Sequence, residues 1–316
     1  MVGFFFRDIF LRHLEGYPHV ESPARLEAII DRVKAGKVAG SVKFIEPGPA
    51  SDEDIELVHD KSYVSKVLEL EVKDHVVLDW GDTVATPASI EAARYAAGAG
   101  IDAVKMVLSG NIDSAFCAVR PPGHHAERNR AMGFCIFNNI AIAARHLIEN
   151  EGLDRVAIVD WDVHHGNGTE SIFEDEGRVF YISLHQYPHY PGTGSADDVG
   201  SGAGAGYTLN IPMPAGSGDL EYLAAFTERI VPALERFEPQ FILISAGFDG
   251  HGADPLSGML LTSTAFERMT EIIVDVAGRF ALGRIVSFLE GGYDLDALAE
   301  SVEYHIAALG GLNIHS

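Results

Sequence analysis

The sequence predicts an α/β fold in a single domain, with an open, mostly parallel sheet that carries helices on both faces. Short and almost entirely apolar runs alternate with longer segments of helical period along the 316 residues. Such runs are typical of parallel strands that are buried on both faces. No change of composition and no internal repeat divides residues 1–316, so we expect one domain.

The predicted strands are seven apolar runs: Val2–Phe6, Val42–Glu46, Ser114–Val119, Val156–Asp160, Val179–Leu184, Phe241–Ala246 and Ile285–Leu289. Two helices are expected to begin near Ser22 and Ser51, where a cap residue precedes a proline or a pair of acids. Further helices are expected over residues 88–108, 138–149, 219–236, 264–280 and 295–308. The glycine-rich segment 191–206 lacks apolar periodicity, so we expect a loop there.

The composition argues against several classes of function. Forty-six acidic residues against 23 Lys and Arg give a formal net charge of −23. This charge repels phosphate backbones, so direct binding to nucleic acid is not expected. No apolar run approaches the length of about 18 residues that a membrane span needs, so no membrane partner is expected. Cys117 and Cys135 provide no disulfide framework, which is typical of a reducing cytoplasm.

Five polar clusters each follow a predicted buried strand. They are RPPGHH (120–125), DWDVHHGNG (160–168), SLHQ (183–186), GFDGHGADP (247–255) and EGGYD (290–294). The carboxyl ends of parallel strands meet at one edge of a sheet, where ligands bind in folds of this class. We therefore expect the side chains of these clusters to form one site.

The spacing of Asp160, Asp162 and His164 predicts part of a metal site. An extended backbone points alternate side chains in one direction, and Asp249 arrives from another strand. Two carboxylates and one imidazole with an open position are typical of catalytic zinc. The alternative is a polar network without a cation, but such a network would bury three carboxylates at a high cost.

Two further groups are candidates for catalysis. His124 and His125 follow the stiff turn 121–123, and adjacent imidazoles beside a metal suit general acid–base chemistry near neutral pH. Tyr293 follows two glycines, which lack side chains and let a phenol approach a ligand closely. Taken alone, Tyr293 is an ordinary half-buried tyrosine.

Together these clusters resemble the histone deacetylase superfamily, which includes acetylpolyamine amidohydrolases and bacterial deacetylase-like enzymes. The resemblance covers nearly the whole chain, through HVESPAR (19–25), RPPGHHAE (120–127), GFCIFNN (133–139), DWDVHHGNGT (160–169), SLHQYPHYPGTG (183–194), AGFDGHGADP (246–255) and EGGY (290–293). Asn167 stands where class I members carry an aspartate, so the chain is similar to class II. The resemblance implies an arginase/deacetylase-like fold and zinc-dependent hydrolysis of an acylated amine, most notably N6-acetyl-lysine.

The resemblance also implies which residues bind metal. The zinc ion, or ferrous iron in the cell, would be bound by Asp162, His164 and Asp249. Members of the family also bind structural potassium. The inner potassium site would use Asp160, Asp162, His164, Ser183 and the backbone of Leu184. The outer site would use backbone near Phe173 and Val179.

In the implied reaction, His125 is the general base and then the general acid, and His124 is its charged or hydrogen-bonding neighbour. Asp160 would pair with His124, and Asn167 with His125. Tyr293 would donate a hydrogen bond to the substrate carbonyl oxygen.

The implied acyl-chain tunnel is lined by Gly133, Phe134, Tyr190, Leu256 and Gly291. Members that prefer acetylated polyamines can place a glutamate where this chain has Leu256, so we expect acetyl-lysine to be preferred. Asp82 is the candidate for the rim carboxylate that holds the substrate backbone, although Asp79 lies close by. Arg25 matches an arginine associated with product acetate, and a helix salt bridge is its alternative role.

Three other functions are alternatives to this one. An acetylpolyamine amidohydrolase is the nearest alternative. An arginase-type enzyme with two manganese ions needs Asp-x-His-x-Asp, whereas here His164 is followed by His165 and Gly166. A catalytically inactive module that binds acyl-lysine would be expected to lose a ligand or the general base, and this chain keeps all of them. The sequence leaves the physiological substrate open, and an oligomer is possible.

Overall fold

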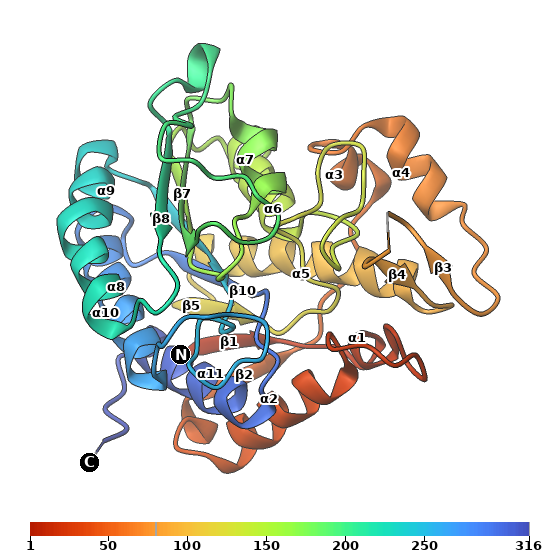
Figure 1. Ribbon diagram of the computed structural model, residues 1–316, viewed down its shortest axis with the longest axis horizontal. Helices are drawn as coiled ribbons and strands as arrows, with labels where there is room; N and C mark the ends of the chain where they lie inside the picture. Colours follow the sequence, from red (N-terminus) through yellow and green to blue (C-terminus); the bar gives the residue numbers. More distant parts are fainter. Residues whose placement is uncertain (80, 316) are drawn as a thin grey trace.

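A parallel sheet of eight strands forms the centre of the computed structural model, which describes residues 1–79 and 81–315 (Figure 1). The strand order is β2-β1-β5-β10-β9-β6-β7-β8, and every neighbouring pair is parallel. The strands are β1 (Val2–Phe5), β2 (Val42–Ile45), β5 (Ser114–Cys117), β6 (Val156–Asp160), β7 (Val179–Gln186), β8 (Thr208–Met213), β9 (Phe241–Ala246) and β10 (Ile285–Leu289). All but the two edge strands are buried along their whole length, as their apolar sequences predict.

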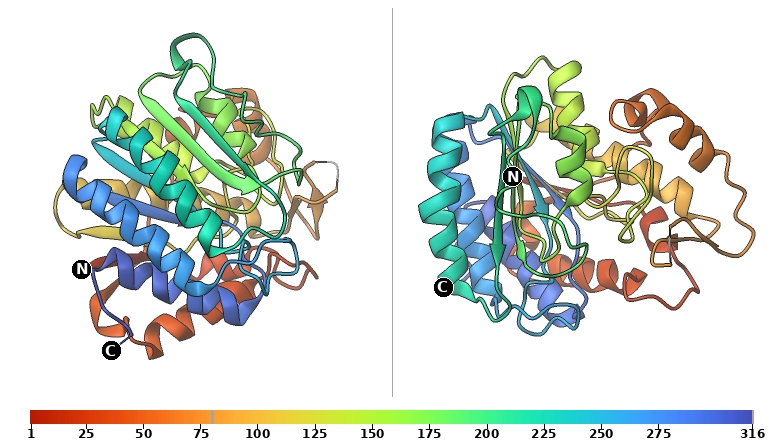
Figure 2. Two further views of the ribbon diagram at one scale, coloured as in Figure 1. Left: turned by 60° about the vertical axis from the view of Figure 1, so that its left-hand side comes forward. Right: turned by 45° about the horizontal axis from the view of Figure 1, so that its top comes forward.

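Helices cover both faces of this sheet (Figure 2). One face carries α5 (Ser89–Leu108), α6 (Asn139–Glu149) and α7 (Asn167–Phe173). The other carries α2 (Pro23–Ala35), α8 (Asp219–Ala225), α9 (Val231–Phe237), α10 (Ser263–Phe280) and α11 (Leu295–Leu309). The predicted α/β architecture is therefore confirmed. Among the described residues, no helix has the length and apolar character needed to cross a membrane.

Smaller elements belong to the first 85 residues of the chain, and all of them except the 3₁₀ turn before β2 lie on the right of the view in Figure 1. They are α1 (Ile9–Arg12), a 3₁₀ turn at Ala39–Ser41, α3 (Asp52–Glu56), α4 (Lys61–Leu68) and the antiparallel pair β3 (Val76–Val77) and β4 (Val84–Ala85). The short helix α3 begins with a capping box, in which Ser51 and Asp54 exchange hydrogen bonds between side chain and backbone. Ser22 precedes α2 as expected, but its side chain forms no capping hydrogen bond.

Three expectations about secondary structure need correction. The edge strand β8 was not predicted, because Asn210 and Pro212 are unusual in strands. The helix expected over 219–236 is divided by a π-helical turn, Phe226–Ile230. Pro232 follows this turn at the start of α9. Proline has no N–H and its ring clashes with the preceding helical turn, so the irregular turn accommodates it.

A third difference concerns the segments around the polar clusters. The helix α7 begins at Asn167, at the end of the polar cluster 160–168, and was not among the predicted helices; an Asn-Gly pair such as Asn167-Gly168 is more typical of a turn. The loop predicted at 191–206 is present and contains only a short 3₁₀ turn, Gly202–Gly204.

A buried charge cluster fixes the amino-terminal segment to the sheet. Glu21, Arg25 and Arg120 are all fully buried. The Glu21 carboxylate accepts hydrogen bonds from Arg120 Nη2 at 2.8 Å and from Arg25 Nη1 at 3.0 Å. Arg120 also donates to the backbone oxygens of Phe10 and His13. Burial raises the pKa of Glu21, but the charge of Arg120 outweighs this effect and holds the pKa well below its usual range.

Replacement of Glu21 by glutamine is expected to destabilise the protein by about 3 to 5 kcal/mol, because two buried guanidinium groups lose their carboxylate. The measurement is the urea unfolding midpoint of purified protein. The control is Glu27→Gln on the exposed side of the following helix, α2, which should change stability by less than about 0.5 kcal/mol. Equal effects of the two substitutions would contradict a structural role for the cluster.

Candidate active site

The polar clusters converge because their strands end side by side. Asp160 at the end of β6 is in register with Ser183 of β7 on one side and with Ser245 of β9 on the other. The segments that follow β5, β6, β9 and β10 therefore leave the sheet at the same edge. The structure brings together the side chains that the sequence predicted to share a site.

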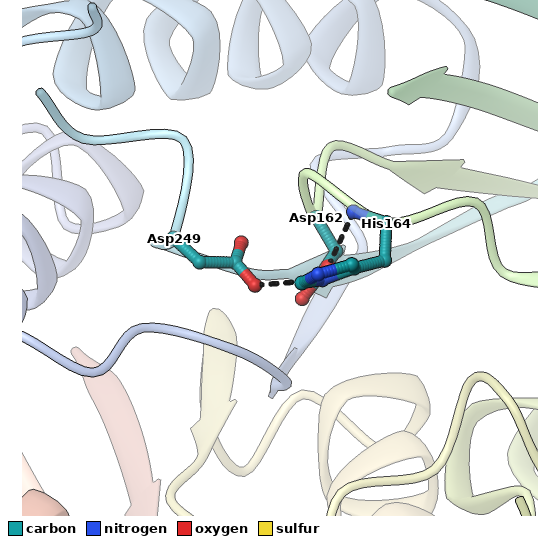
Figure 3. A group of neighbouring side chains, drawn as sticks. All are labelled: Asp162, His164 and Asp249. Carbon is teal, nitrogen blue, oxygen red and sulfur yellow. Dashed lines mark hydrogen bonds and ion pairs between the residues drawn. The ribbon is translucent and has the colours of Figure 1, made fainter. Parts of the chain in front are cut away.

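Asp162, His164 and Asp249 form the most compact group of potential metal ligands (Figure 3). One ligand atom from each lies within 4.8 Å of the others. His164 Nδ1 is 3.1 Å from Asp162 Oδ1 and 3.1 Å from Asp249 Oδ2. Within residues 1–79 and 81–315 no other group of three such side chains is as close.

The backbone around the three residues leaves one oxygen of each carboxylate directed at the imidazole. Asp162 Oδ2 accepts the N–H of Gly291 at 2.8 Å, and Asp249 Oδ1 accepts the N–H of Val163 at 3.0 Å. Gly291 must be glycine, because a Cβ there would overlap the carboxylates of both aspartates. Burial and the negative charge of Asp162 raise the pKa of Asp249 to about 7. Two buried carboxylates facing one imidazole fit a divalent cation of the zinc type.

Asp160 does not join this group. The strand β6 ends at Asp160, so the expectation of one extended backbone through His164 was wrong. Asp160 Oδ1 accepts the backbone N–H of Asp162 at 3.1 Å, which turns the chain away from the sheet. Its other oxygen lies 3.1 Å from His124 Nδ1 and accepts the hydroxyl of Tyr181 at 3.1 Å.

The two adjacent histidines have different partners and different electrostatic environments. His124 lies between Asp160 and Asp162, at 3.1 and 3.9 Å. Burial lowers its pKa, but these carboxylates outweigh burial and raise it to about 10. Burial and the nearby charge of His124 instead hold the pKa of His125 well below its usual value. At neutral pH the pair therefore consists of a charged His124 and a neutral His125.

The hydrogen bonds of Asn167 indicate which nitrogen of His125 carries the proton. Asn167 Nδ2 donates to Glu127 Oε1 at 2.8 Å, which directs the amide oxygen toward His125 Nδ1, 2.8 Å away. An amide oxygen only accepts hydrogen bonds, so Nδ1 of His125 bears the hydrogen and Nε2 carries the lone pair. This arrangement prepares Nε2 to accept a proton.

Tyr293 faces His125 across one cavity of about 160 Å³. Burial raises the pKa of Tyr293 well above its usual value, so the phenol remains a hydrogen-bond donor. The cavity is lined by Asp82, Pro122, His124, His125, Gly133, Phe134, Asp162, His164, Tyr190, Leu256, Gly291 and Tyr293. All five residues expected in the tunnel line this cavity, and it ends at the potential metal ligands.

One wall of the cavity requires an unusual backbone. Gly133 and Phe134 both have positive φ angles, 56° and 69°. A Cβ at Gly133 would overlap the ring of His125. Phe134 is held in this costly conformation partly by its backbone N–H, which donates to Thr83 Oγ1 at 3.0 Å.

The rim contains both acidic residues named from the sequence, and their surroundings differ. Asp79 Oδ1 accepts the backbone N–H groups of Gly81, Asp82 and Thr83, so this carboxylate stabilises a turn. Asp82 lines both the tunnel and a neighbouring cavity of about 420 Å³. Burial and the charge of Asp79 raise the pKa of Asp82 to about 6. Asp82 is thus the better placed of the two for contact with a substrate.

Arg25 is buried behind Tyr293, with its guanidinium 4.9 Å from the centre of the phenol ring. It donates to the backbone oxygens of Gly292 and Glu290, each at 2.6 Å, and to Glu21. Arg25 on α2 therefore forms a salt bridge, its alternative predicted role, with Glu21 just before the helix. A role for Arg25 with acetate stays a prediction.

The residues expected at potassium sites lie along β7 and beside it. Ser183 and Leu184 are buried on β7, with Ser183 in register with Asp160. Phe173 ends α7 and Val179 begins β7. These positions bring carboxylate, hydroxyl and backbone oxygens close to the sheet edge.

Three residues near the site were not singled out from the sequence. His189 stacks on His164, with ring centres 4.9 Å apart, and its Nε2 lies 3.0 Å from the backbone oxygen of Leu256. Asp254 accepts the backbone N–H groups of Tyr293 and Leu256, at 2.6 and 2.9 Å. Glu290 accepts the backbone N–H of Gly123 at 2.7 Å. All three residues belong to motifs that carry the family resemblance, so their position in those motifs was the available signal.

Comparison with known proteins gives consistent matches. Residues 19–309 match the histone deacetylase domain family. A probable deacetylase of Archaeoglobus fulgidus is 40% identical over 317 residues, covering 99% of this chain and 88% of that protein. The human protein named polyamine deacetylase HDAC10 is 41% identical over 294 residues, covering 90% of this chain and 43% of its own length. The crystal structure of the HDA15 HD domain superposes with a TM-score of 0.93 at 38% identity, covering 99% of this chain and 89% of that one.

The wild-type protein is expected to bind one zinc ion per chain, measured by elemental analysis and competition with a chromophoric chelator. Asp249→Ala should weaken zinc binding by more than about a hundredfold, because loss of a ligand's hydrogen-bond partner alone weakens it about 10- to 100-fold. Asp296→Ala, at an exposed position, is the matched control and should bind zinc normally. Two transition-metal ions per chain, or full binding by Asp249→Ala, would contradict the assignment.

Proposed function

This chain belongs to the histone deacetylase family, and on that basis we propose that it is a zinc-dependent deacetylase acting on N6-acetyl-lysine in proteins or small molecules. The observation that carries the proposal is the content of one cavity. A narrow, largely apolar tunnel ends where Asp162, His164, His125 and Tyr293 meet. Such a tunnel fits an extended acyl-amine side chain with its amide at the base.

Asp162, His164 and Asp249 would hold the metal, which is zinc or, in the cell, ferrous iron. When bound, this ion supplies a Lewis acid that polarises the amide carbonyl and makes water more acidic. Two carboxylates largely neutralise its charge, so other groups must contribute to the reaction. The proposed contributors are His125 and Tyr293.

His125 takes a proton from the attacking water through Nε2, because Nδ1 is protonated against Asn167. The same nitrogen then returns the proton to the departing amine, which is a very poor leaving group as an anion. Burial, together with the nearby charge of His124, lowers the pKa of His125, which favours a neutral imidazole that can accept a proton. No covalent intermediate with the protein is needed.

Tyr293 donates its phenolic hydrogen to the oxygen of the amide as negative charge develops there. Its backbone is fixed by Asp254, and its ring lies against the guanidinium of Arg25. One well-placed donor of this kind typically contributes about 10²- to 10³-fold in rate.

We also propose structural potassium sites at the residues named from the family resemblance. The proposed inner site combines residues at and after the ends of β6 and β7, namely Asp160, Asp162, His164, Ser183 and the backbone of Leu184. Carboxylate, hydroxyl and carbonyl oxygens suit a hard cation.

Acetylated polyamines are the second candidate substrate, favoured by the similarity to a protein named polyamine deacetylase. Leu256, at the tunnel mouth, argues against acetylated polyamines as the preferred substrate. Leu256 lines the tunnel, and an apolar side chain offers no partner to the distant ammonium group of a polyamine. We therefore propose acetyl-lysine as the preferred substrate.

Release of acetate from an acetyl-lysine peptide tests the proposed activity. We expect activity that a chelator abolishes and one equivalent of zinc restores. Asp249→Ala protein should not recover with zinc. Activity that survives complete removal of metal would contradict the mechanism. Release of urea from arginine would support the arginase alternative, and binding of the peptide without hydrolysis would support the inactive module.

Leu256→Glu is expected to shift the preference toward acetylspermidine by about ten- to a hundredfold in kcat/KM. A partly desolvated carboxylate–ammonium pair contributes about 1 to 3 kcal/mol. Both substrates should be compared at two salt concentrations, with Leu256→Gln as the neutral control. A tenfold wild-type preference for acetylspermidine that persists at high salt would contradict the choice of acetyl-lysine.

A further inference from the structure

Glu290 is a buried carboxylate beside the active site that the proposed reaction does not use. It lies at the carboxyl end of β10 and is fully buried. Its Oε2 accepts the backbone N–H of Gly123 at 2.7 Å and that of His124 at 3.2 Å. Its Oε1 accepts the hydroxyl of Ser245 at 3.3 Å. Three donors from two separate segments thus converge on one side chain.

The backbone of the same residue connects two more segments. The N–H of Glu290 donates to the oxygen of Ala246, at the end of β9. Its carbonyl oxygen accepts Arg25 Nη2 at 2.6 Å. Glu290 therefore joins β9, the helix α2, its own loop and the turn that carries the histidine pair.

We propose that Glu290 is a positioning residue that fixes the distance between His125 and Tyr293. This inference rests on the proposed deacetylase function. His125 follows directly on the backbone that Glu290 binds, and Tyr293 lies three residues beyond Glu290 on the same loop. The carboxylate links the two sides of the catalytic cavity.

Other contacts hold the turn through its carbonyl groups and side chains: the oxygen of Pro121 accepts Asn139 Nδ2 at 3.1 Å, and the imidazole of His124 lies against Asp160. Glu290 is the side chain that accepts the backbone N–H groups of Gly123 and His124. On the opposite side of the turn, the N–H of Thr169 donates to the oxygen of His124 at 3.1 Å. Without an acceptor at residue 290, two buried backbone N–H groups would lose their bonds, which is costly and favours a shift of the turn. A displacement of about 1 Å at a catalytic group can lower the rate about a hundredfold.

The contacts of Glu290 require a hydrogen-bond acceptor at the end of a side chain as long as that of glutamate. One oxygen receives both backbone N–H groups, and an amide oxygen has the two lone pairs needed to do the same. The Ser245 hydroxyl can rotate and accept a hydrogen from an amide NH₂. Glutamine at residue 290 can therefore accept both backbone N–H groups of the turn. Aspartate is one methylene shorter, so its carboxylate cannot reach them.

The test compares Glu290→Gln, Glu290→Asp and Glu290→Met with the wild-type holoenzyme. We expect Gln to retain kcat within about threefold, and Asp and Met to lose about a hundredfold in kcat. The KM and the zinc content should change little, because neither the tunnel wall nor a metal ligand is altered. The reverse order, an active Asp variant and an inactive Gln variant, would show that negative charge matters and would overturn the proposal.

A matched control is Glu303→Met on α11. Glu303 is another buried glutamate, and it accepts the backbone N–H of Lys37 and the guanidinium of Arg32 far from the cavity. The Glu303→Met substitution should lower the melting temperature and leave kcat within about threefold of the wild-type value. Equal losses of kcat in the Glu290 and Glu303 variants would reduce Glu290 to a general stability role. If Glu290→Met does not fold, the kcat values of Glu290→Gln and Glu290→Asp still test the positioning role.

A measurement without turnover separates this inference from the proposed function. The imidazole ¹⁵N NMR signals of His124 and His125 in zinc-loaded protein should be unchanged in Glu290→Gln and shifted in Glu290→Asp. An inactive wild type with this NMR pattern would contradict the deacetylase proposal and leave the positioning role standing. Unchanged signals in every variant would overturn the positioning role.

Discussion

The burial of four carboxylates at one sheet edge is the constraint on which the rest of the site depends. Asp160, Asp162, Asp249 and Glu290 are almost completely inaccessible to solvent, and an uncompensated buried charge is very costly. Each has its own compensation. Asp160 faces His124 and a tyrosine hydroxyl, and Glu290 receives backbone N–H groups. Asp162 and Asp249 each accept a backbone N–H group, from Gly291 and Val163, and both face the imidazole of His164, so a divalent cation fits beside these three side chains.

This arrangement of charge also separates the roles of the two histidines. His124 is placed against the carboxylates, which raise its pKa to about 10, whereas burial and then the nearby charge of His124 lower the pKa of His125. Class I members carry an aspartate where this chain has Asn167. A neutral amide orients His125 without raising its pKa through a full charge, so its Nε2 remains available as a base near neutral pH. Two adjacent histidines therefore differ in protonation because one lies against the Asp160 carboxylate and the other against the Asn167 amide.

The sheet and the site residues were predictable from the sequence because both are encoded locally. Seven apolar runs predicted seven strands of the large sheet, and the polar clusters that follow them marked its carboxyl edge. The edge strand β8 was missed because its half-exposed sequence contains Asn210 and Pro212. Period-two spacing suggested that Asp160, Asp162 and His164 share an extended segment, but the strand β6 ends at Asp160, whose side chain accepts a hydrogen bond from the backbone N–H of Asp162. Contacts between distant segments, such as Glu290 with the His124 turn, have no local signature.

Hydrogen bonds between distant segments also connect the proposed substrate selection with the proposed catalysis. The charge of the whole chain is −23, yet at physiological salt its field is screened beyond about 8 Å, so we propose that the side chains lining the cavity, rather than the net charge, select the substrate. Leu256 on that wall and Tyr293 at the base are fixed by one carboxylate, since Asp254 binds the backbone N–H of both. A change at residue 256 that displaces this backbone therefore displaces the phenol as well. Selectivity at the mouth can be altered without loss of rate only by substitutions that preserve the hydrogen bonds of Asp254.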